Sequence, residues 1–128
     1  MNYFFSKTVD LDFAQAEERI RGLLKEQGFG ILTEIDIQAT LKEKLDVDFK
    51  KYKILGACNP PFAYKALLSE DKIGLMLPCN VIIQGTKEGK TEVASIDPVA
   101  SMSAVENDKL KDVAFQIREK LQAVINGI

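Results

Sequence analysis

Residues 79–97, CNVIIQGTKEGKTEVASID, contain two runs of strand-forming residues separated by a short polar segment. The runs cover 79–86 and 91–97, and the segment KEGK between them supplies Gly89 for the positive φ that a tight turn needs. Pro98 ends the second run because it has no N–H for a sheet hydrogen bond. The stretch predicts a β-hairpin, and a hairpin favours an antiparallel sheet.

Apolar spacing on both sides of this hairpin predicts three more strands and several helices. Strands are expected at 2–7, 31–36 and 52–58, and helices at 12–28, at 37–45, after Pro61 and over about 20 residues after Ser103. Asp12 with Gln15, and Ser103 with Glu106, have the spacing of capping boxes. The order predicts an α+β fold with a single antiparallel sheet of about five strands, helices on one face and a long C-terminal helix.

The composition fits one domain spanning residues 1–128. Of the 128 residues, 46% are hydrophobic, which is enough for one core, and the 17 basic and 19 acidic residues give a net charge of −2. No stretch concentrates Lys or Arg, so nucleic acid is not an expected partner, and no segment approaches the roughly 20 apolar residues that span a bilayer. Since residues 1–6 do not resemble a signal peptide, we expect a cytoplasmic location.

The chain contains no histidine. Catalysis by a Cys-His or Ser-His-Asp arrangement is therefore excluded, and so are the commonest zinc sites. Acid–base chemistry would depend on Asp, Glu, Lys, Tyr or a thiol. The sequence specifies no cofactor and does not decide whether the protein is an enzyme.

The two cysteines occupy similar settings at strand ends. Cys58 lies in LGACNPP (55–61) and Cys79 in LPCNV (77–81), so that each is followed by an asparagine, Asn59 or Asn80, and stands near a proline. If the hairpin turns at 88–89, Asn80 lies opposite Asp97. An antiparallel arrangement of the strands would bring both cysteines and Asp97 to one end of the sheet, whereas a parallel one would separate the cysteines.

A cluster of this kind allows several functions. Two thiols with amides and a carboxylate could hold a soft metal, form a redox disulfide or bind a small polar ligand. Two thiolates alone make an incomplete zinc shell, and the cysteines do not form a Cys-X-X-Cys pair. The alternative is that both are buried core residues at strand ends, with Asn59 and Asn80 serving turns.

Two residues outside the cluster are also candidates. Lys44, on the short helix expected at 37–45, could place its ammonium over an anionic ligand, although such lysines are usually solvated. Phe115 lies off the apolar stripe of the last helix, so it could cover a dimer contact or widen the core face.

Five short segments together resemble the domain-of-unknown-function family 302. They are GFG (28–30), KEKL (42–45), LGACNP (55–60), LPCNV (77–81) and DP (97–98), and in order they cover nearly the whole chain. The resemblance implies a fold of TATA-binding-protein-like topology, commonly as a homodimer, and it does not imply DNA binding. The motif positions implied are Lys44, Cys58, Asn59, Pro60, Cys79, Asn80 and Asp97.

These observations lead to one functional hypothesis and two alternatives. The hypothesis is a small cytoplasmic domain, expected to be homodimeric, that binds a small ligand or metal through Cys58, Asn59, Cys79 and Asn80, with Asp97 and Lys44 nearby. One alternative is a thiol enzyme or redox protein that uses both cysteines, with Cys58 as the better nucleophile because it stands just before a helix. The other is a structural dimerisation module without a site.

Overall fold

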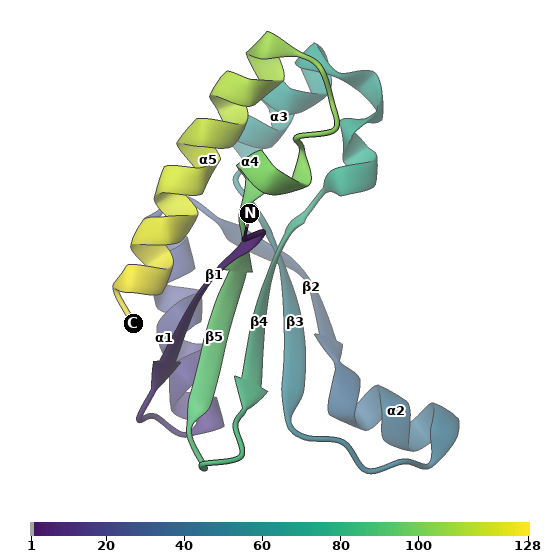
Figure 1. Cartoon of the computed structure of the whole chain (residues 1–128), viewed down its shortest axis with the longest axis vertical. Helices are drawn as coiled ribbons and strands as arrows, with labels where there is room; N and C mark the ends of the chain where they lie inside the picture. Colours follow the sequence, from purple (N-terminus) through teal and green to yellow (C-terminus); the bar gives the residue numbers. More distant parts are fainter. Residues whose placement is uncertain (1) are drawn as a thin grey trace.

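The computed structural model describes residues 2–128 as a five-stranded antiparallel sheet with helices (Figure 1). The strand order is β1-β5-β4-β3-β2, and every neighbouring pair is antiparallel. The strands are β1 (Phe4–Val9), β2 (Gly30–Asp36), β3 (Tyr52–Cys58), β4 (Cys79–Gly85) and β5 (Thr91–Ile96). The α+β class and the single antiparallel sheet are therefore confirmed.

Helices α1 (Phe13–Glu26) and α5 (Asp108–Asn126) pack against each other and against the same face of the sheet (Figure 1). The capping box predicted for α1 is present, because Asp12 Oδ1 accepts from the Gln15 N–H at 2.8 Å and Gln15 Oε1 accepts from the Asp12 N–H. The core lies between these helices and the sheet. Its largest fully buried side chains include Ile20, Leu24, Leu55, Val81, Ile83, Val93, Leu110, Leu121 and Ile125.

The other helices lie at the two ends of the sheet (Figure 1). Helix α3 (Pro60–Ser69), the 3-10 helix η1 (Asp71–Met76) and the short α4 (Pro98–Ser101) gather at the end where β3 finishes and β4 begins. Helix α2 (Ile37–Leu45) follows β2 at the opposite end and buries none of its side chains. Within residues 2–128, neither α1 nor α5 covers the opposite face of the sheet, and we call it the open face (Figure 1).

Two local predictions were wrong. Asn107, not Ser103, caps the last helix: Asn107 Oδ1 accepts from the N–H groups of Lys109 and Leu110, while the Ser103 hydroxyl donates to the Ala100 carbonyl at the end of α4. The hairpin pairing also differs by one residue, since Val81 stands opposite Ser95.

The physical reason for the shifted pairing is the length of the turn. The Thr86 N–H donates to the Lys90 carbonyl, which leaves a loop of residues 87–89 with Gly89 at φ 74°. This register continues the ladder with Asn80 in line with Ile96 rather than with Asp97. Residues directly opposite each other share a face of the sheet and successive residues point to opposite faces, so Asn80 shares its face with Ile96 and the predicted pairing with Asp97 does not occur.

Candidate functional site

The two cysteines meet at one end of the sheet. Strands β3 and β4 are antiparallel, Ala57 stands opposite Cys79, and Cys58 follows Ala57 as the last residue of β3. The antiparallel alternative left open by the sequence is therefore the one that occurs. Both sulfur-bearing side chains belong to the end of the sheet that α3 and η1 cover.

The environments of the two thiols differ. Cys79 is 5% exposed, and burial, with a smaller contribution from Cys58, raises its pKa to about 11. Cys58 is half-buried, and both cysteines are free. Because the Cys79 thiol stays protonated at neutral pH, it is a poor nucleophile and a poor metal ligand.

A cavity of about 320 Å³ lies beside the cysteines. Helix α3 supplies Ala63, Ala66 and Leu67, which share one helical face because they are three and four residues apart. The remaining wall residues come from the strand ends, η1 and α5. They are Phe29, Leu32, Ala57, Cys58, Asn59, Gly74, Leu77, Pro78, Cys79 and Ile117. We call this space the thiol cavity; its walls are almost entirely apolar.

Asn59 lines the thiol cavity, and the NH₂ group of its amide is bonded to the backbone. Its side chain is 7% exposed, and Nδ2 donates to the Gln27 carbonyl at 3.1 Å. Gln27 is the C-cap of α1, and Gly28 follows at φ 86°, where an added Cβ would lie 3.2 Å from Asn59 Nδ2. Asn59 therefore ties the end of α1 to the start of α3, which is a structural role.

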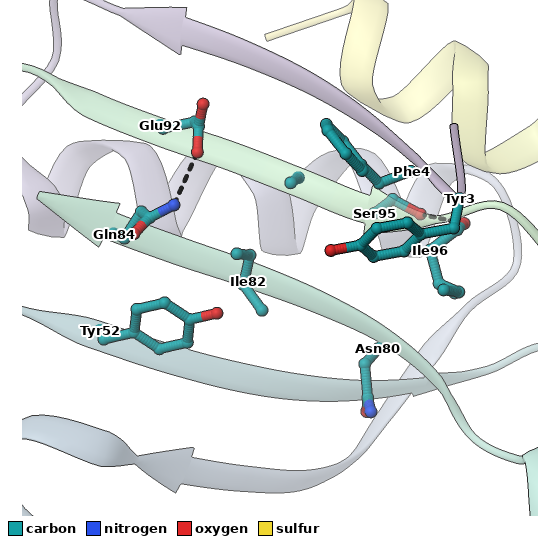
Figure 2. A pocket seen from close by; sticks show the side chains of 10 residues that line it. Tyr3, Phe4, Tyr52, Asn80, Ile82, Gln84, Glu92, Ser95 and Ile96 are labelled. Carbon is teal, nitrogen blue, oxygen red and sulfur yellow. Dashed lines mark hydrogen bonds between the residues drawn. The ribbon is translucent and has the colours of Figure 1, made fainter. Parts of the chain in front are cut away.

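Asn80 points to the open face of the sheet, away from the thiol cavity. It is exposed and lines a different pocket together with Tyr3, Tyr52 and Glu92 (Figure 2). Successive side chains of a strand alternate between faces, so Cys79 and Asn80 cannot both face the cavity. The expected cluster of two thiols and two free amides is thus divided between two places.

Comparison with known proteins assigns the chain to a family. The family model described as domain of unknown function DUF302 matches residues 5–128, nearly the whole length. The chain belongs to the DUF302 family. It is also similar to the crystal structure of an uncharacterized conserved DUF302 protein from Bacillus stearothermophilus, with 27% sequence identity and a TM-score of 0.91 over 98% of each chain. None of the curated proteins is significantly similar to it.

Asp97 of this DUF302 domain serves the fold around α4. Its side chain is buried, Oδ1 accepts from the Val99 N–H at 3.0 Å, and Oδ2 accepts from Arg118 Nε at 3.2 Å. The carboxylate thus caps α4 and joins it to α5. It is not among the residues that line the thiol cavity.

Lys44 lies at the opposite end of the DUF302 domain. Strand β2 begins opposite Cys58 and ends opposite Lys53, and α2, with an exposed Lys44, follows that far end. The antiparallel run of β2 therefore carries Lys44 away from both cysteines (Figure 1). Among residues 2–128, no three His, Cys, Asp or Glu side chains gather closely enough to hold a metal ion.

Sequence reasoning missed the apolar walls of the cavity. In the sequence, Ala63 and Ala66 indicated only the apolar face of a helix. In the structure, these small side chains leave the space that larger ones would fill. Leu32 reaches the cavity from the irregularity in β2 between Ile31 and Thr33, where the register shifts. A bulge has no clear signature in one sequence, so this wall could not be anticipated.

Proposed function

We propose that this DUF302 domain binds a small, predominantly apolar molecule in the thiol cavity. The observation that carries the proposal is the cavity of about 320 Å³, with apolar walls from α3, η1, α5 and the strand ends and with a half-buried thiol, Cys58, among them. Concave, mostly apolar spaces with few polar groups are typical small-molecule sites. The hydrocarbon part of the ligand would pack against the alanines of α3 and against the sulfur of Cys58.

The polar groups of the site favour this apolar ligand over the polar one expected from the motif. The Asn59 amide donates to Gln27, Asn80 faces the other side of the sheet, and Asp97 is engaged with α4 and Arg118. A strongly polar or charged ligand would lose its hydration in the cavity and gain few hydrogen bonds there.

Thiol catalysis has less support than binding. The raised pKa of Cys79 keeps that sulfur neutral. Pro60 and Pro61 occupy the first turn of α3 and have no N–H groups, so the helix start near Cys58 offers fewer donors to a thiolate than most helices do. Activation of Cys58 by this helix, which the sequence suggested, is therefore weakened.

Indole is a suitable apolar probe, because cavities smaller than this one admit benzene. Titration of the ¹⁵N-labelled protein with indole should give saturable chemical-shift changes at the amides of Ala63, Ala66 and Cys58. Indole should also slow the alkylation of Cys58 by N-ethylmaleimide. Absence of saturable changes, or of protection, would contradict the proposal.

A cavity-filling variant provides the control for this titration. Ala63→Leu adds a side chain at a half-buried wall position, and Ala39→Leu makes the same change at an exposed position of α2. We expect Ala63→Leu to weaken indole binding at least roughly tenfold and Ala39→Leu to leave it unchanged. Equal affinities in the two variants would show that indole binds elsewhere.

Homodimer formation and a cytoplasmic location are separate proposals. Exposed apolar side chains gather on α3 and η1, where Leu68 is 70% and Leu75 is 87% exposed, which supports a contact with a second copy there more than the single exposed Phe115 does. Native mass spectrometry of the wild type and of Leu75→Asp tests the contact; a dimer that Leu75→Asp does not weaken would contradict it.

The two free thiols support the proposal of a cytoplasmic location, because a reducing compartment keeps thiols free. No helix within residues 2–128 is long and apolar enough to span a membrane.

A further inference from the structure

The open face of the sheet carries a second pocket that the proposed function does not use. Its volume is about 380 Å³, and its apolar floor is Ile82 of β4 (Figure 2) with Ala94, which stands opposite Ile82 on β5. Tyr3, Tyr52, Gln84 and Glu92 stand around this floor. We call it the open-face pocket; it is separated from the thiol cavity by the thickness of the sheet.

One end of the open-face pocket is rich in hydrogen-bond acceptors. Glu92 is the sole charged side chain in its lining within residues 2–128, and it forms no ion pair there. Gln84 Nε2 donates to Glu92 Oε1 at 2.6 Å, whereas Gln84 Oε1 is buried and meets no donor within the same residues. This end therefore combines a negative charge with an unsatisfied acceptor, and Lys50, Lys51 and Lys87 line the adjoining cavity that shares Gln84 and Glu92.

Aromatic side chains define the width of the pocket. The hydroxyls of Tyr3 and Tyr52 point toward each other across Ile82 (Figure 2). Burial, together with nearby Tyr3 and Glu92, raises the pKa of Tyr52, so the Tyr52 hydroxyl is neutral near pH 7. Tyr3 is held in place because its carbonyl accepts from the Asp97 N–H at 2.7 Å.

We propose that the open-face pocket binds a small organic cation with a flat apolar ring, of the aromatic amine or amidine class. The ring lies on Ile82 and Ala94 between the two tyrosines, and its N–H groups donate to the Glu92 carboxylate. A planar N–H fork matches a carboxylate well, and an anionic ligand would be repelled by Glu92. The Lys50 ammonium already lies 5.9 Å from the centre of the Tyr52 ring, so the rim of this pocket contacts a cation within the chain itself.

Benzamidine is the test ligand, and benzamide, which has the same ring but no charge, is its control. Titration of the ¹⁵N-labelled protein should give saturable shifts at Ile82, Glu92 and Ala94 with benzamidine, and at least roughly tenfold weaker binding of benzamide. Glu92→Gln keeps the size of the side chain and should weaken benzamidine binding at least roughly tenfold, while Tyr52→Phe should weaken it about threefold. An unchanged melting temperature shows that the variants are folded.

Three results would overturn the proposal. The first is equal binding of benzamide and benzamidine, and the second is unchanged benzamidine binding in Glu92→Gln. The third is a dimer in solution that Phe4→Lys converts to a monomer, because a second copy would then occupy this face. The thiol cavity is not involved in any of these measurements, so they do not depend on the binding of indole.

Discussion

Cys79 and Asn80 are neighbours in the chain and belong to different surfaces of the molecule. Cys79 is 5% exposed and lines the apolar thiol cavity beside α3, whereas Asn80 is exposed and lines the acceptor-rich open-face pocket. The alternation of side chains along β4 produces this division. A short motif that reads as one site in the sequence therefore contributes to two sites of opposite chemistry.

The two pockets also differ in how they are enclosed. Helix α3, η1 and the bulged β2 surround the thiol cavity, while a bare sheet face forms the open-face pocket. Substitutions in the walls of the thiol cavity should affect stability and ligand binding together, because these walls are part of the core. Substitutions in the open-face pocket should affect ligand binding with little effect on stability.

Gly56 should give the largest effect, because it lies where the two regions meet. A Cβ at this position would overlap Thr33 Oγ1 and come within 2.8 Å of Pro78 Cγ, and the proline ring cannot rotate away. We expect Gly56→Ala to lower the free energy of unfolding by about 3 kcal/mol, measured by urea denaturation.

Gly22 is the matched control for that variant. A Cβ at Gly22 meets no atom within 4 Å, and the residue lies inside α1. Gly22→Ala should therefore raise stability by roughly 0.5–1 kcal/mol, since alanine favours the helix. If both variants had the same effect, the close approach at Gly56 would be disproved.

Alkaline pH should lower the free energy of unfolding through ionisation of the buried Cys79 thiol. Its pKa is raised from 9.0 to about 11, so the folded state holds the thiol proton more tightly than the unfolded chain does. The stabilisation is fully present below pH 9 and is lost as the pH rises through 11. Urea denaturation under reductant should show wild type losing about 2 kcal/mol more than Cys79→Ala over this range; equal losses would mean that Cys79 ionises freely.

The two motif asparagines should respond differently to removal. Asn59→Ala breaks the buried hydrogen bond to the Gln27 carbonyl and should cost about 1–2 kcal/mol of unfolding free energy. Asn80→Ala removes an exposed side chain and should change stability by less than about 0.5 kcal/mol. If Asn59→Ala weakened indole binding without destabilising the protein, Asn59 would be a ligand-binding residue after all.

Lys44 should give the smallest effect. It is exposed on α2 at the end of the sheet opposite the cysteines. Lys44→Ala should change the free energy of unfolding by less than about 0.5 kcal/mol and leave indole affinity unchanged. A change in indole affinity would place α2 closer to the cavity in solution than the structure does.

Local patterns predicted the elements of this fold well. Strand β3, the end of β2, both boundaries of α2 and the capping box of α1 follow from apolar spacing and from side chains that bond to nearby backbone. Whether the strands that carry the two cysteines are antiparallel could not be predicted, because the order and direction of the strands depend on contacts between segments distant in the chain. The pairing of Asn80 was missed by one residue, since it depended on whether the turn of the hairpin held three residues or four.

The candidate site was predicted only in part for the same reason. Sequence placed Cys58 and Cys79 at strand ends, and the structure brings them together. It could not show that Asn59 bonds to Gln27 or that Asp97 bonds to Arg118, because these partners lie 32 and 21 residues away. The open-face pocket had no sequence signature, since its residues are spread over β1, β3, β4 and β5 and come together only through the register of the sheet.

The most direct test of the division between two sites is a titration of one ¹⁵N-labelled sample with indole and then with benzamidine. Two separate responses are expected: indole shifts the amides of Ala63 and Ala66 and not that of Glu92, and benzamidine does the reverse. Overlapping responses, or no saturable response to either compound, would contradict the account that adjacent residues of β4 serve two different binding sites.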